Sequence, residues 1–99
     1  MLSKHDVSVL VQESIKGLNQ EKEEGKEIPV ANDTVLLGRG SLLDSLDFIV
    51  IITDVEERLY ASTGQNLRLV VELDLPEEAN PFRDVGTLSE HITAMLSPG

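Results

Sequence analysis

The sequence predicts a small all-α protein, an antiparallel four-helix bundle of three longer helices and one short helix with a long first loop. Three observations support this fold class. Apolar residues recur with a helical period in three segments of the chain. Residues that typically begin or end helices lie beside these segments. The stretch between the first two segments is interrupted by glycine, proline, asparagine and aspartate, which favour loops. A chain of 99 residues accommodates one domain, 1–99, with a modest core.

The first helix is expected to begin after Ser3, which with Asp6 three residues later resembles a capping box. Apolar residues then share one helical face for about four turns; they are Val7, Leu10, Val11, Ile15 and Leu18. Charged residues dominate 21–27, which we interpret as a solvated helix end or loop. The long loop that follows, 28–41, contains apolar residues that we expect to hold it against the helices: Ile28, Val30, Val35, Leu36 and Leu37.

The second helix, the most regular of the three, is predicted to begin at Asp44 or Ser45 and to end near Gly64. One face of it suits a buried core; its members are Phe48, Ile51, Ile52, Val55 and Leu59. The opposite face carries a second apolar set, which we call the outward patch: Leu46, Ile49 and Val50. Because solvated helix faces are normally polar, the outward patch is interpreted as a surface for a partner.

The last third of the chain gives weaker signals. Apolar and polar residues alternate over 67–73, but no second strand is evident, so an extended segment packed along the helices is expected. Residues 74–80 are predicted to make the short helix, with Pro76 at its first position. Thr87 with Glu90 is predicted to form a capping box that opens the last helix. The inward residues of that helix are expected to be Leu88, Ile92, Met95 and Leu96.

Composition restricts the possible functions. There are 18 acidic against 8 basic residues, a net charge of -10, which argues against binding of nucleic acid or anionic membranes and favours partners with basic surfaces. The absence of cysteine excludes disulfides, zinc–thiolate sites and cysteine nucleophiles. The two histidines are far apart, and no nucleophile–base pair or metal-ligand set is evident, so we expect no enzymatic activity. No signal-peptide pattern or apolar run of about 18 residues is present, which favours a cytoplasmic protein without membrane insertion.

The tripeptide Asp44-Ser45-Leu46, at a loop-to-helix junction in a small acidic chain, resembles the prosthetic-group site of acyl carrier proteins. The resemblance covers most of the chain and implies that 4'-phosphopantetheine is attached to Ser45 by a phosphodiester. The thiol of this arm would hold acyl groups as thioesters. The implied partners are a phosphopantetheinyl transferase and acyl-loading and acyl-transfer enzymes of fatty acid, lipid or polyketide-type biosynthesis, with the carrier acting as a monomer. The chain departs from the commonest family pattern before the motif, where Gly-Arg-Gly-Ser-Leu-Leu replaces a single Gly-x. This departure indicates a specialised carrier.

In that family, acidic residues on the second helix meet basic patches of partner enzymes. The resemblance therefore implies a partner-binding set on this helix that includes two residues of the outward patch: Asp47, Ile49, Val50, Asp54, Glu56 and Glu57. Val50 stands where many carriers have an acidic residue, so a more apolar contact is expected.

Two other functions are consistent with the sequence. One is a peptidyl or aminoacyl carrier of the same fold, which would use the same serine. The other is an unmodified acidic helical interaction module whose outward patch binds a partner helix. Ser41 is a second candidate acceptor, but Leu42 and Leu43 follow it, so it lacks the acidic-Ser-Leu setting of Ser45.

Overall fold

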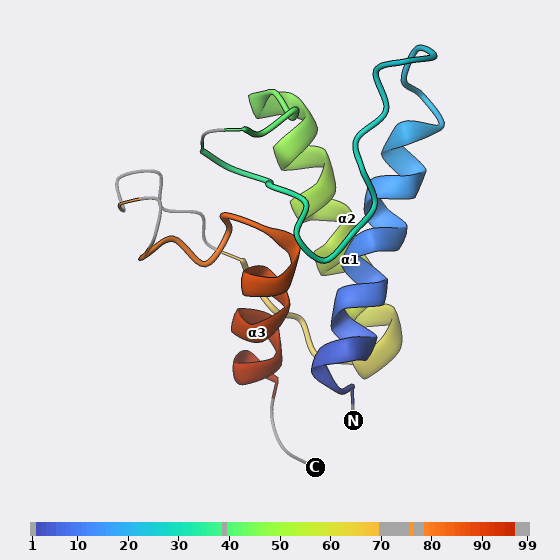
Figure 1. Ribbon diagram of the computed structural model, residues 1–99. Helices are drawn as coiled ribbons and strands as arrows, with labels where there is room; N and C mark the ends of the chain where they lie inside the picture. The colour runs from blue at the N-terminus through green and yellow to red at the C-terminus, as the bar shows by residue number, and fades with distance from the viewer. Residues whose placement is uncertain (1, 39, 70–75, 77–78, 97–99) are drawn as a thin grey trace.

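The computed structural model describes residues 2–38, 40–69, 76 and 79–96. Within these residues the fold is all-helical, as predicted, with three helices: α1 Lys4–Asn19, α2 Ser45–Thr63 and α3 Val85–Met95. α1 packs against both of the others (Figure 1). None of the three is long and apolar enough to cross a membrane.

The short fourth helix is not confirmed. The segment predicted to form it, 74–80, falls mostly outside the described residues. Among the residues that are described there, Ala79 has a 3₁₀ conformation, and its N–H donates to the Pro76 carbonyl over 2.9 Å. The alternation over 67–73 is likewise described only as far as Leu69, which is buried, whereas Arg68 is exposed. Residues 65–69 are not assigned to a strand.

Local signals set the limits of α1 and α2. The predicted capping box of α1 is present: Ser3 Oγ accepts from the Asp6 N–H at 3.1 Å, and Asp6 Oδ2 accepts from the Ser3 N–H at 3.0 Å. Asp44 caps α2 through a 2.7 Å bond from the Asp47 N–H to its Oδ1. Gly64 ends α2 with φ of +74°, a left-handed conformation that glycine adopts without a steric penalty.

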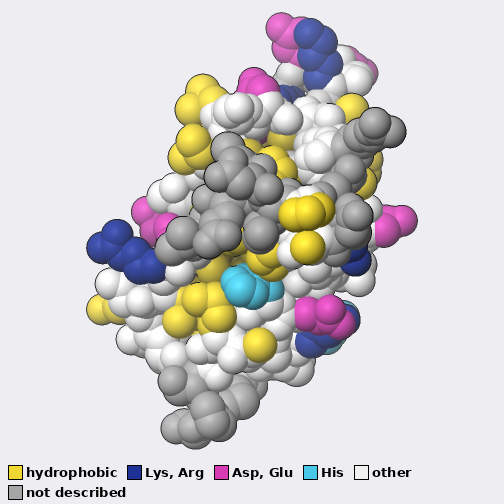
Figure 2. Space-filling view, turned by 90° about the vertical axis from the view of Figure 1, so that its left-hand side faces the viewer, with side chains coloured by type: hydrophobic (Ala, Val, Ile, Leu, Met, Phe, Trp, Pro, Cys, Tyr) yellow, Lys and Arg dark blue, Asp and Glu magenta, His cyan; other side chains and the backbone are white. Residues whose placement is uncertain are grey.

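The core lies between the helices and receives side chains from every connection. All five residues predicted to face inward on α2 are buried, as are Val7, Val11, Ile15 and Leu18 of α1. The connections add Ile28, Leu36, Leu69 and Phe82. The rings of Phe48 and Phe82 form a T-shaped pair with centroids 6.1 Å apart. On the face shown in Figure 2, hydrophobic side chains reach the surface in several groups and charged side chains lie mainly near the outline.

The start of α3 differs from the prediction. The N-cap is Asp84, whose Oδ1 accepts from the Thr87 N–H at 2.7 Å, so the predicted capping box of Thr87 and Glu90 is wrong. Aspartate is a stronger N-cap residue than threonine, so Asp84 was itself a local signal for the start of α3. Residues 32–37 of the long loop lie against the residues that precede and begin α3, and Val35 forms a bridge with Asp84.

Carbonyl groups of this loop also satisfy the first N–H groups of α3. The Val85 N–H donates to the Thr34 carbonyl at 3.1 Å, and the Gly86 N–H donates to the Asn32 carbonyl at 2.8 Å. These N–H groups have no partner within their own helix, so their bonds to the loop fix both segments at once. The long loop is therefore attached to α3 by specific hydrogen bonds. Residues 36–43 then connect it to the start of α2.

Candidate functional site

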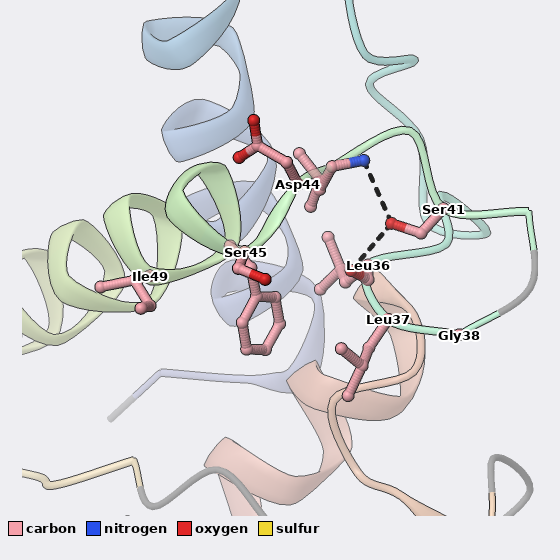
Figure 3. A pocket seen from close by; sticks show the side chains of 9 residues that line it. Leu36, Leu37, Gly38, Ser41, Asp44, Ser45 and Ile49 are labelled. Carbon is pink, nitrogen blue, oxygen red and sulfur yellow. Dashed lines mark hydrogen bonds between the residues drawn. The ribbon is translucent and has the colours of Figure 1, made fainter. Parts of the chain in front are cut away.

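A pocket of about 330 Å³ opens between the long loop and the first turn of α2 (Figure 3). It is lined by Leu36, Leu37, Gly38, Ser41, Leu43, Asp44, Ser45, Phe48 and Ile49. Ser45 occupies the first position of α2 and is exposed. In Figure 3 its hydroxyl points into the pocket, whereas the Asp44 carboxylate points away from it. The predicted attachment residue therefore stands at the mouth of an apolar hollow.

The two candidate acceptor serines line this same pocket but differ in their hydrogen bonds. Ser41 Oγ donates to the Leu36 carbonyl at 3.0 Å and accepts from the Leu43 N–H at 3.1 Å. Its hydroxyl thereby holds the loop in shape. The Ser45 hydroxyl makes no hydrogen bond to any residue that the structure describes. A reaction at Ser41 would break these two hydrogen bonds of the loop, whereas a reaction at Ser45 would break none among the described residues.

The start of α2 favours negative charge, and the Asp44 carboxylate already occupies part of it. Asp44 uses its carboxylate on the Asp47 N–H, and its carbonyl accepts from the Phe48 N–H at 3.0 Å. The N–H groups of the first helical positions lie at the N-terminal end of α2, where the helix dipole favours negative charge. A phosphate attached to Ser45 would lie beside this end of the helix.

The outward patch is exposed along α2. The exposed fractions of Leu46, Ile49 and Val50 are 70%, 59% and 45%, and Leu42 in the preceding loop is 63% exposed. Ile49 also lines the pocket, so the patch and the pocket form one continuous apolar surface that begins beside Ser45.

The four acidic residues predicted to bind partners have different surroundings. Asp47 forms an ion pair with Lys22 of the charged segment. Asp54 Oδ2 lies 2.7 Å from Arg58 Nε. Glu56 Oε2 accepts from the Leu69 N–H at 2.8 Å and so fastens the segment after α2. Glu57 is exposed and has no hydrogen bond or ion pair within the described residues.

The surroundings of Asp54 also change its acidity. Partial burial raises the pKa of this carboxyl, but hydrogen bonds from Ser14 and Arg58, together with the Arg58 charge, outweigh the burial. The net result is that the pKa of Asp54 lies below its ordinary value. Asp54 is therefore held as a charged partner of Arg58 on the side of α2 that meets α1.

Two features of this site escape sequence reasoning. In the sequence, Lys22 is one of several charged residues in a segment interpreted as solvated. In the structure it binds Asp47, 25 positions away. Leu36 and Leu37 were expected only to hold the long loop against the helices, yet together with Gly38 they form a wall of the pocket. The glycines and leucines before Asp44 are a weak signal for such a wall, but the wall itself depends on the path of the loop.

No protein-family model, curated protein or solved structure matches the chain.

Proposed function

We propose that this protein is an acyl carrier that bears 4'-phosphopantetheine on Ser45. The observation that carries the proposal is the setting of the Ser45 hydroxyl. It is exposed, without a hydrogen bond among the described residues, and at the N-terminus of a capped helix beside an apolar pocket. Ser41, the competing acceptor, is held by two hydrogen bonds.

In the proposed modification, a separate transferase uses coenzyme A as the donor. The Ser45 oxygen attacks the phosphorus that bears the pantetheine, the bond to the adenosine half breaks, and 3',5'-ADP leaves. The transferase takes up the serine proton. The phosphodiester that forms carries one negative charge, which the dipole at the start of α2 favours and the neighbouring Asp44 carboxylate opposes.

The carrier itself supplies no catalysis in this proposal. The thiol at the end of the arm holds an acyl group as a thioester, and the arm presents it to the active sites of partner enzymes in the cytoplasm. The outward patch beside Ser45 is the proposed docking surface. Asp47, Asp54 and Glu56 each bind a group within the chain, so they are less available to a partner. We therefore expect docking to depend mainly on apolar contact, with Glu57 as the acidic residue that remains available. The overall negative charge would steer the approach of basic partners.

The test is the intact mass after incubation with coenzyme A and a phosphopantetheinyl transferase of broad specificity. The wild type is expected to gain one phosphopantetheinyl group, Ser45→Ala none, and Ser41→Ala the same as the wild type. Ser45→Ala should fold because the cap of α2 is made by Asp44, and a melting curve by circular dichroism checks this. Modification that persists in Ser45→Ala would contradict the assignment.

Two alternatives remain as outcomes of further measurements. A peptidyl or aminoacyl carrier would be loaded at the same serine, and the cargo accepted from purified loading enzymes separates it from an acyl carrier. An unmodified interaction module is favoured by the exposure of the outward patch, which exists without any arm. A wild type that remains unmodified by the transferase would support the interaction module.

A further inference from the structure

The ion pair between Lys22 and Asp47 is the most enclosed of those that the structure describes. The side chains of Lys22 and Asp47 are 22% and 15% exposed, whereas both members of the Lys26–Glu23 pair in the same charged segment are largely exposed. Partly buried pairs are screened less by solvent and salt than exposed ones. The pairing of Lys22 is therefore a persistent feature of the fold, unlike that of Lys26.

The backbone holds Lys22 in reach of α2. Its N–H donates to the Asn19 carbonyl at 3.1 Å, one turn beyond the last residues of α1. Asn19 is itself bound in both directions to Ile28: its Nδ2 donates to the Ile28 carbonyl at 2.8 Å, and its Oδ1 accepts from the Ile28 N–H at 2.7 Å. The end of α1 thus brings a lysine to the first turn of α2.

Asp47 lies at the edge of the outward patch. It precedes Val50 by three positions and Asp54 follows Val50 by four, and residues at these spacings are neighbours on a helix surface. Lys22 neutralises the first acid, and Arg58 neutralises the second. One edge of the patch therefore carries two ion pairs in place of two free carboxylates.

We propose that Lys22 is a specificity-determining residue of this surface. By masking Asp47, it keeps this edge of the docking surface nearly neutral, so that the contact itself favours an apolar partner face, whereas the net charge of -10 acts on the approach of the partner. Removal of Lys22 would leave a free carboxylate beside Val50, and opposite charge at the rim of an interface raises the rate of association. The identification of these partners as acyl-loading or acyl-transfer enzymes rests on the proposed function. The masking of Asp47 is independent of that function.

The test uses a synthetic amphipathic peptide of leucine and lysine as the probe, titrated into the ¹⁵N-labelled protein and followed by NMR. At low salt, Lys22→Gln is expected to bind the peptide about threefold or more tightly than the wild type, with shifts at the outward patch. The gain should be lost in about 0.5 M salt, where charges are screened over a few ångströms. Lys22→Arg, which keeps the ion pair, should behave as the wild type.

Two controls separate masking of Asp47 from other effects. Lys26→Gln removes the same charge from the same segment and should change the affinity much less. Asp47→Asn in the Lys22→Gln background should cancel the gain. An affinity that is unchanged or weaker in Lys22→Gln would overturn the proposal and make Lys22 a purely structural residue, which a lower melting temperature would show. The titration decides this whether or not Ser45 is loaded, so its failure is distinct from that of the carrier function.

Discussion

The two faces of α2 carry similar side chains in opposite environments. Ile51 is fully buried and Ile49, two positions earlier on the same helix, is 59% exposed. Likewise Val55 is fully buried and Val50 is exposed. Both faces are apolar, so composition does not distinguish them; the position of α1 and of the long loop does. Apolar side chains on the packed face stabilise the fold, whereas those on the open face contribute little to stability and are available for binding.

The largest difference between the faces is expected from a matched pair of substitutions. Ile51→Ala should lower the free energy of unfolding by about 2–5 kcal/mol, because it leaves a cavity in the core. Ile49→Ala makes the same chemical change on the same helix and should cost less than about 1 kcal/mol, as surface substitutions usually do. Urea unfolding measures both. Equal losses would mean that the outward patch is covered in solution, and the comparison would fail.

The next prediction concerns what the open face does. Ile49→Asp and Val50→Asp should each reduce the rate of Ser45 loading about tenfold or more, since a charge at the centre of an apolar contact must be desolvated. Their effect on unfolding should stay below about 1 kcal/mol.

Val9→Asp is the matched control for these two variants, because Val9 is an exposed apolar residue on α1, away from the pocket. It should leave the rate of loading unchanged. If Val9→Asp slows loading as much as Val50→Asp does, general charge repulsion and not the outward patch governs docking.

Two helical glycines extend the comparison to the other helices. An alanine Cβ at Gly86 would lie 2.9 Å from Asn32 Nδ2 and 3.3 Å from its carbonyl oxygen, so Gly86→Ala should destabilise by about 1 kcal/mol despite its better helix propensity. Gly17 of α1 has no atom within 4 Å of that position, so Gly17→Ala should stabilise by about 0.5–1 kcal/mol. Thermal melting gives both signs. A stabilising Gly86→Ala would show that the contact between α3 and the loop is loose.

The smallest effect is expected at the boundary between the two faces, where Asp54 pairs with Arg58. The pKa of Asp54 is lower in the folded protein than its ordinary value of 3.8, so its contribution to stability is complete above that value. The contribution is lost as the pH falls through the lower pKa of the folded state. Asp54→Asn should therefore flatten the acid side of the stability profile slightly below pH 4, measured by urea unfolding at several pH values. A profile identical to that of the wild type would indicate that Ser14 and Arg58 do not lower the pKa of Asp54 in solution.

Much of the fold follows from local sequence. The capping box of Ser3 and Asp6, the end of α2 at Gly64 and the buried face of α2 were all predictable. Each depends on residues within a few positions of one another, where helical spacing and backbone preference determine the outcome. The same spacing places the outward patch opposite the core face of α2, but the path of α1 and of the long loop leaves the patch uncovered.

The rest depends on contacts between distant segments. The first N–H groups of α3 find acceptors in the loop residues Asn32 and Thr34, and no local pattern specifies the approach of these residues. The difference between Ser41 and Ser45 has the same origin, since only the folded loop places Ser41 Oγ on the Leu36 carbonyl.

The sequence by itself therefore determined the helices, their inward faces and the candidate serine. The tertiary structure alone decided which groups remain free to act. The partners of Asp47 and Glu56 lie 25 and 13 residues away, and the wall of the pocket comes from the loop before α2. Helical periodicity specifies the direction of a side chain on its own element, but the chemical partner of that side chain is specified only when the chain brings a second element against it.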